Sequence, residues 1–306
     1  MEDATRRSFS HSRQTKNQNE YFYEVSGYKT YLYDPLFPYE SGWDKYALKY
    51  ASLLEPGTLY YLHKEVMYNY LEQQVLPALA GRQLRVLDVN CGTGNDFPFW
   101  LGKGANITGI DGSAGMLNKA AATYREGIND GRVSLYQGRL EELEKDSLGL
   151  REFDIIYSIT GGFSYIDDSV FSDKIGVLKD MLAPDGVMVT AHLNNFCLPE
   201  SLAFLFRGKF SRSMVRLKKI ISLGNGETMY LRGHRSLVRL FKPYFPEVET
   251  RPLIAVAPPY QTDLRFSPSL LHQFRRLETA CTGHNFGRSW ADQIIVTCRN
   301  KENERT

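Results

Sequence analysis

The chain has few cysteines, no long apolar run and almost no net charge, and each absence argues against a class of protein. Its four cysteines are scattered, with no C-x-x-C pair and no histidine at metal-ligand spacing, so we expect reduced thiols, no metal and a cytoplasmic location. No stretch approaches ~18 apolar residues, and the polar N-terminus lacks the apolar segment of a secretory signal. The net charge of +2 over 306 residues demands neither nucleic acid nor membrane, and we expect no membrane partner.

The strongest pattern lies between residues 84 and 111. An apolar run is followed by a glycine-rich turn, a helix-like segment and a second apolar run that ends at Asp111. This order is typical of a nucleoside-binding β-α-β unit, in which the acid accepts both ribose hydroxyls. The dinucleotide-binding motif G-x-G-x-x-G needs a third glycine, and Phe97 occupies that position here. The Lys-Ser or Lys-Thr pair that follows the glycines of a P-loop is also missing. The pattern argues against NAD or FAD, excludes a P-loop, and leaves a ligand with a ribose and no pyrophosphate.

Three segments resemble the small-molecule type of class I S-adenosylmethionine-dependent methyltransferases. Asp88–Gly94 (Asp-Val-Asn-Cys-Gly-Thr-Gly) resembles the D-x-G-x-G-x-G signature of that family, and Gly109–Ser113 with Met116 resembles its second motif. Leu178–Gly186 resembles its L-x-x-x-L-x-P-G-G segment. The resemblance implies S-adenosyl-L-methionine as cofactor. It also implies these cofactor-binding positions: Asp88, Asn90, Gly92, Gly94, Asp111, Gly112, Met116, Gly138, Arg139, Leu140 and Ser158.

Two of these positions depart from the family pattern. Asn90 replaces the first glycine of the signature, and asparagine is among the residues that best tolerate a positive φ, so the turn can survive. Arg139 stands where the family has an aspartate that binds the adenine amino group, and a guanidinium accepts no hydrogen bond. We therefore expect backbone groups of Arg139 and Leu140 to contact the adenine.

The resemblance and the apolar periodicity together predict an α/β, Rossmann-like methyltransferase fold. We expect a mostly parallel seven-stranded sheet with helices on both faces, a helical N-terminal lid and an inserted cap. The predicted strands are 84–90, 107–111, 133–137, 153–158, 187–193, 248–256 and 293–298. The predicted units are a flexible N-terminus (1–19), the lid (20–81), the cofactor-binding core (82–195), a basic cap insertion (196–230) and a C-terminal part of the core with a substrate-side insertion (231–300).

Positive charge is concentrated in residues 201–242, which hold ten lysines and arginines and one acid, Glu227. Most such runs are solvated helix faces. The size of the imbalance also leaves open an anionic substrate or an acidic protein partner at the cap.

Methyl transfer needs alignment and exclusion of water more than it needs a base. His192 ends the fifth predicted strand and Tyr165 follows a glycine loop beside the expected pocket, so both are candidate catalytic residues. A buried structural histidine is the more common role for a residue such as His192. No H-x-x-H, C-x-x-C or acid cluster indicates a metal.

Three functions remain open from the sequence. The first is methyl transfer to an N or O atom of a small molecule, because the tyrosine-rich lid and the cap insertion can close over a small ligand. The second is RNA methylation with the basic stretch as the RNA surface, which the low overall charge disfavours, so we expect no nucleic acid partner. The third is a non-methylating homologue that binds the cofactor, suggested by Asn90 and Arg139.

Overall fold

The computed structural model describes residues 22–25, 28–31, 43, 56–148, 152–159, 161–222, 228–262 and 264–300. Residues 1–19, predicted to be flexible, lie outside these ranges. Among the described residues, every helix is too short or too polar to span a bilayer.

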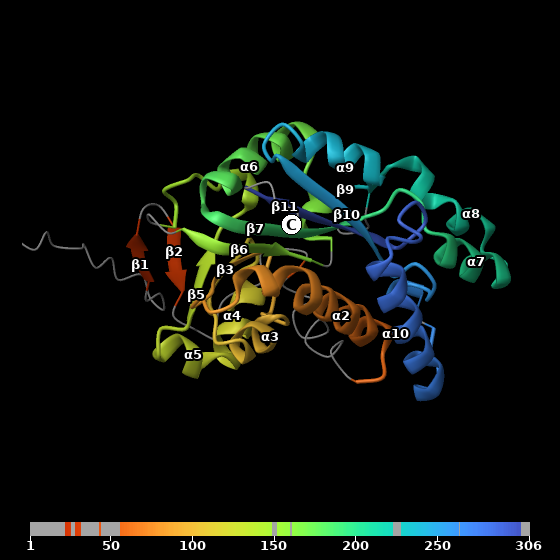
Figure 1. The fold of residues 1–306 in the computed structure, drawn as a ribbon, viewed down its shortest axis with the longest axis horizontal. Coiled ribbons are helices and arrows are strands. Elements are labelled where there is room, and N and C mark those ends of the chain that lie inside the picture. Colours follow the sequence, from red (N-terminus) through yellow and green to blue (C-terminus); the bar gives the residue numbers. More distant parts are fainter. Residues whose placement is uncertain are drawn as a thin grey trace, which may run out of the picture.

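The centre of the described part of the chain is a twisted sheet of seven strands, as the sequence predicts (Figure 1). The strand order is β5-β4-β3-β6-β7-β11-β10, in which β11 runs antiparallel to β7 and β10 and all other neighbours are parallel. The strands are β3 (Arg85–Val89), β4 (Asn106–Asp111), β5 (Val133–Gln137), β6 (Phe153–Ser158), β7 (Leu182–Leu193), β10 (Glu247–Leu253) and β11 (Gln293–Arg299). The chain order reverses between β3 and β6, so the carboxyl ends of β3, β4 and β6 form the crevice where such sheets bind ligands.

Helices cover both faces of the sheet (Figure 1). One face carries α2 (Leu59–Tyr70), α3 (Phe97–Gly102), α4 (Ala114–Thr123) and α10 (Pro268–Gly283), and short α5 (Arg125–Asn129) follows α4. The other face carries α6 (Asp168–Asp180) and α9 (His234–Phe241). All six residues of β6 are buried, as expected for a central strand of a sheet that is covered on both faces.

Side-chain caps begin the helices beside the crevice. Ser113 Oγ accepts a hydrogen bond from Met116 N (3.2 Å) at the start of α4, and Asp167 accepts one from Ser169 N (2.9 Å) at the start of α6. Such caps satisfy backbone N–H groups that the first turn leaves unpaired.

The N-terminal range 20–81, predicted as a helical lid, is not helical throughout. β1 (Phe22–Val25) and β2 (Tyr28–Tyr31) form an antiparallel hairpin, and β2 pairs with β5 through Lys29 and Gln137. The described part of the sheet therefore has nine strands. The boundaries of the predicted units stay a prediction.

The cap insertion consists of α7 (Leu198–Phe206), α8 (Phe210–Ser213) and a hairpin of β8 (Ile220–Ser222) and β9 (Thr228–Tyr230). A buried arginine, Arg216, fastens it to the core. Its guanidinium donates to Asp292 Oδ1 (2.6 Å) and to the Asp292 carbonyl (2.8 Å) beside β11, and it pairs with the Glu200 carboxylate of α7. The orientation of α7 is thus set by an ion-pair network and not only by apolar packing.

Candidate functional site

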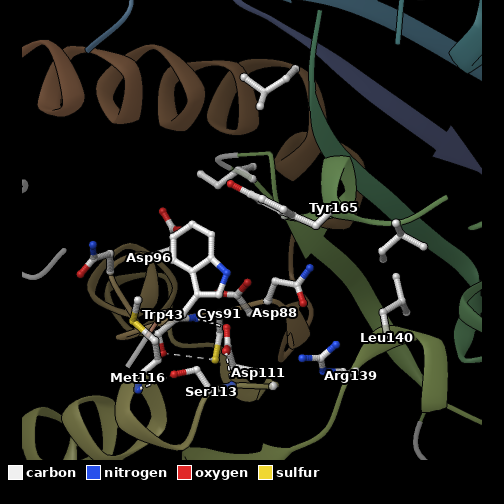
Figure 2. Close-up of a pocket in the computed structure, with 18 of the residues that line it drawn as sticks. Trp43, Asp88, Cys91, Asp96, Asp111, Ser113, Met116, Arg139, Leu140 and Tyr165 are labelled. Carbon is white, nitrogen blue, oxygen red and sulfur yellow. Dashed lines mark hydrogen bonds between the residues drawn. The ribbon is translucent and has the colours of Figure 1, made fainter. Parts of the chain in front are cut away.

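A cavity of about 440 Å³ opens at the carboxyl ends of β3, β4 and β6 (Figure 2). This volume lies within the ~300–1,000 Å³ range of small-molecule sites. Its lining includes nine predicted site residues: Asp88, Asn90, Gly92, Asp111, Gly112, Met116, Arg139, Leu140 and Tyr165. Four others that the structure also describes do not contribute to the lining: Gly94, Gly138, Ser158 and His192.

The turn after β3 has three residues in the left-handed region. Asn90 has φ 60°, Gly92 has φ 56° and Gly94 has φ 73°. The expected tolerance of Asn90 for this conformation is therefore confirmed. Gly94 is also required for space, because a Cβ there would lie 2.7 Å from the ring of Tyr124. Gly94 thus shapes the turn from behind, without touching the cavity.

Asp111 ends β4 with both carboxylate oxygens held in place. Oδ2 accepts a hydrogen bond from Gly92 N (2.8 Å), and Oδ1 accepts one from Ser113 N (2.8 Å). The carboxylate is therefore oriented by the turn and by the start of α4 together. A carboxylate oxygen has two lone pairs and can accept more than one hydrogen bond.

The far end of the cavity is closed by the segment after β5. Arg139 Cγ lies 3.1 Å from the position that a Cβ on Gly112 would take, so the small residue lets the arginine stem pack against the turn. Leu140 is buried beneath it, and Glu141 joins them in the lining. The Glu141 carboxylate can accept hydrogen bonds, which the Arg139 guanidinium cannot. An acid two residues after the arginine is the sequence signal for this position.

A buried polar cluster forms the opposite end. Lys64 Nζ of α2 donates to both carboxylate oxygens of Asp96 (2.8 and 2.7 Å), and Tyr68 Oη donates to Asp96 Oδ1 (2.7 Å). Asp88 lies beside them, and its Oδ2 has no hydrogen-bond partner among the described residues. Burial and the charge of Asp96 raise the pKa of Asp88, although Lys64 opposes the shift. The uncompensated oxygen is a feature of a polar ligand site.

Aromatic rings form the rest of the wall. Trp43 and Tyr165 meet edge to face with centroids 5.4 Å apart, and Tyr60 and Tyr260 do the same at 5.0 Å. Figure 2 shows Tyr165 across the cavity from Asp111, with Trp43 between them. Two elements distant in sequence, α2 and the segment after β10, therefore supply a common aromatic surface.

Tyr165 is positioned by a buried arginine. Arg232 donates to the carbonyl oxygens of Phe163 (2.9 Å) and Ile166 on either side of the tyrosine, and pairs with Asp168 (2.6 Å). Its guanidinium also lies over the Phe171 ring at 5.1 Å. The loop that carries Tyr165 is thereby fixed to the segment that follows the cap hairpin.

His192 lies elsewhere, fully buried among Phe163, Phe171 and Phe241. Its Nε2 is 2.9 Å from Thr190 Oγ1, and burial, with the charge of Arg232, lowers its pKa well below the usual range. This position is typical of a structural histidine. The catalytic role predicted for it has no support from its surroundings.

Three further points complete the site. Gly138 N donates to the Asp111 carbonyl (3.0 Å), and Ser158 is buried behind the turn. Among the residues that the structure describes, no three His, Cys, Asp or Glu side chains are grouped to hold a metal.

Sequence reasoning missed Lys64, Asp96 and Tyr260. A lysine on the buried face of a helix was the one available signal for the first of them.

Comparison with known proteins now adds to the geometry. Residues 86–186 match a family model described as a methyltransferase domain. A tRNA U34 carboxymethyltransferase of Histophilus somni is 33% identical over 138 residues, which are 44% of this chain and 41% of the relative. A ubiquinone biosynthesis O-methyltransferase of Marinobacter nauticus is 30% identical over 141 residues, 46% of this chain and 54% of the relative. The chain thus spans about half the length, or less, of these curated relatives.

A solved structure resembles most of the chain. It is phosphoethanolamine N-methyltransferase 2 of Haemonchus contortus in complex with S-adenosyl-L-methionine, with a TM-score of 0.53 at 14% identity. The match covers 85% of this chain and 57% of that one. At this identity the match shows a common fold.

Proposed function

Residues 86–186 belong to the class I S-adenosylmethionine-dependent methyltransferases, and from this premise we propose that the chain transfers a methyl group to an N or O atom of a small molecule. The observation that carries the proposal is the oriented Asp111 carboxylate, facing a cavity that the left-handed turn at Asn90 and Gly92 leaves open. A ribose without a pyrophosphate fits this end of the cavity.

The residues present suit S-adenosylmethionine. Asp111 would accept the two ribose hydroxyls, and Gly112, Met116 and Leu140 would enclose the adenine, with Glu141 as an acceptor for its amino group. Asp88 would bind the ammonium of the methionine portion, because its free oxygen is otherwise uncompensated. This cofactor supplies a methyl group already activated on a sulfonium.

The chain itself contributes alignment and exclusion of water. Orientation of the acceptor alone contributes about 7–11 kcal/mol to lowering such a barrier. The aromatic wall would hold the acceptor, and Tyr165 is our candidate for the residue that orients it, since Arg232 fixes its loop from both sides. Burial and the neighbouring Asp96 raise the pKa of Tyr68, so that phenol stays protonated and serves as a hydrogen-bond donor. His192 is not part of this proposal.

RNA modification is a second candidate, which the Histophilus relative and the basic stretch support. It predicts salt-sensitive retention of bulk tRNA, because phosphate contacts release counterions. A third candidate, a homologue that binds the cofactor without transferring a methyl group, is supported by Asn90 and Arg139. It predicts a bound cofactor but no S-adenosylhomocysteine across a panel of small acceptors.

Calorimetric titration of S-adenosylmethionine into wild type and Asp111→Ala tests the proposal. Loss of hydrogen bonds to a charged group costs about 1.5–3 kcal/mol, so we expect about 10- to 150-fold weaker binding. Asp146→Ala is the matched control, since that acid is exposed and outside the cavity. Thermal unfolding of each variant separates loss of the site from loss of the fold. Equal affinity of folded Asp111→Ala and wild type would contradict the proposed site.

Identification of co-purifying molecules by mass spectrometry would then address the acceptor. A heterocyclic or phenolic compound beside the cofactor would agree with the aromatic wall. Recovery of RNA fragments alone would favour the second candidate.

A further inference from the structure

Exposed apolar side chains are concentrated in one segment of the cap. Of the thirteen large hydrophobic residues that are exposed in the described part of the chain, eight lie between residues 198 and 220. Phe206 is 86% exposed and Phe210 is 69% exposed, and Met214 and Leu217 are each more than half exposed. Soluble proteins rarely expose so many large apolar side chains within one short segment without a partner.

The same segment carries positive charge without compensation. Arg207, Lys209, Arg212, Lys218 and Lys219 are exposed, and residues 201–222 contain no acid. Arg207 donates to the Thr262 carbonyl (2.7 Å), which leaves four cations directed to solvent. Apolar and basic side chains therefore alternate over this segment, which we call the cap surface (residues 198–220).

The cap surface is held rigidly. Arg216 pairs with Glu200 and Asp292 beneath it, and Ser201 Oγ donates to the Ser213 carbonyl (2.7 Å), which ties α7 to α8. Figure 1 shows α7 and α8 at one end of the molecule, opposite β1 and β2. The exposed phenylalanines at the junction of α7 and α8 thus project from a fixed support.

We propose that the cap surface docks onto a bilayer that contains anionic phospholipids. Exposed Phe and Leu side chains insert at the headgroup–acyl boundary, and lysines and arginines beside them attract the negative lipid phosphates. A second copy of the chain is a poorer occupant, because an isologous contact would oppose four uncompensated cations to four others. The phosphates of a nucleic acid would pair with the cations but would leave the apolar side chains exposed to water. This peripheral contact differs from the absence of a membrane partner that the sequence predicted, which rested on the low net charge and the lack of a spanning segment.

Flotation of the full chain with vesicles tests the proposal. We expect the wild type to float with vesicles of phosphatidylcholine and phosphatidylserine, to remain unbound with phosphatidylcholine alone, and to lose binding as salt increases. Absence of binding to the anionic vesicles would overturn the proposal, as would equal binding to neutral vesicles.

Two double variants separate the contributions. Phe206→Ser with Phe210→Ser should weaken binding at least about tenfold for each ring. Lys209→Gln with Arg212→Gln should weaken it roughly fivefold for each charge. Leu277→Ser on α10 and Lys145→Gln are the matched controls, both exposed and outside the cap surface, and should bind as wild type does.

Other occupants give different results. A dimer, detected by light scattering, that dissociates on replacement of the two phenylalanines would assign the surface to a second copy. Binding of tRNA that depends on Lys209 and Arg212 but not on the phenylalanines would assign it to nucleic acid. Either outcome, like wild-type vesicle binding by both double variants, would overturn the proposal.

Discussion

Replacing Arg216 with methionine should destabilise the protein strongly. The methionine retains much of the apolar stem but removes the only cation that contacts the buried carboxylates of Glu200 and Asp292 among the described residues. The Asp292 side chain is 1% exposed and that of Glu200 is 12% exposed, so water screens neither charge well. Removal of one partner from a buried ion pair typically costs about 3–5 kcal/mol, and we expect a loss of unfolding free energy of about that size near neutral pH.

The loss should depend on pH, with a sign that follows from Glu200. Burial raises the pKa of Glu200 above its usual value, and the attraction of Arg216 limits that rise. In Arg216→Met the attraction of the arginine is absent, so the pKa of Glu200 in the folded state rises further. The folded variant therefore binds a proton at Glu200 more readily than the unfolded chain does. The resulting stabilisation is fully present below the unfolded pKa of about 4.3 and is lost as pH rises through the higher folded value. The penalty of the substitution should therefore be smaller near pH 4.5 than near pH 7.5.

Urea denaturation of wild type and variant at these two pH values gives the required difference. Arg212→Met is the matched control, because that arginine is exposed in the same cap, and it should change the unfolding free energy by less than about 0.5 kcal/mol. A penalty for Arg216→Met below about 1 kcal/mol at neutral pH, or one that is equal at both pH values, would refute the role assigned to the network.

Two further predictions concern buried groups near the site. Arg232→Met should lower the unfolding free energy by about 2–6 kcal/mol in urea denaturation, because two buried carbonyls lose their hydrogen-bond donor. Replacement of the exposed Arg235 by methionine should leave the unfolding free energy unchanged. Equal effects of the two substitutions would contradict the role of Arg232 in fixing the Tyr165 loop. His63 and His192 are buried with lowered pKa values, His63 to about 3 through burial and the charge of Lys64. Because the unfolded chain binds these protons first, each histidine should lower stability by roughly 1.4 kcal/mol for each pH unit below about 6.5, and His192→Phe should remove the contribution of one of them.

Two strands were predicted with the bounds that the structure has. The expected bounds of 133–137 and 153–158 agree with β5 and β6, although only β6 is buried along its whole length. β7 begins five residues earlier than expected, at Leu182 instead of Val187. Pro184 and Gly186 are typical turn residues, yet the strand passes through them with a shift in its register against β6.

The hairpin of β1 and β2 was missed for a different reason. The crowded tyrosines of residues 21–33 were interpreted as the start of a helical lid. The Ser26-Gly27 dipeptide between two short runs of strand-forming residues is a turn signal, and it predicts a hairpin more directly.

The cofactor end of the site could be predicted because its parts are close in sequence. Gly92 and Asp111 belong to one β-α-β unit, so a local motif predicts their contact. The polar cluster could not be predicted in this way, because Lys64 and Asp96 are 32 residues apart and meet only when α2 packs on the sheet. The same holds for Tyr60 and Tyr260, whose edge-to-face contact depends on the tertiary fold.

Asn90 also constrains the order in which the sequence can change over time. Its side chain lies where a larger residue at position 162 would need space, since a Cβ on Gly162 would be 2.8 Å from Asn90 Nδ2 and 2.9 Å from Asn90 Cβ. Glycine at position 90 would remove these two contacts without losing the left-handed turn, although Ser158 Oγ would still lie 3.2 Å away. A lineage could therefore accept alanine at 162 only after glycine had replaced Asn90, and a lineage with alanine at 162 could not then gain the asparagine. The two positions are expected to vary together among descendants of this chain, in one permitted sequence of steps.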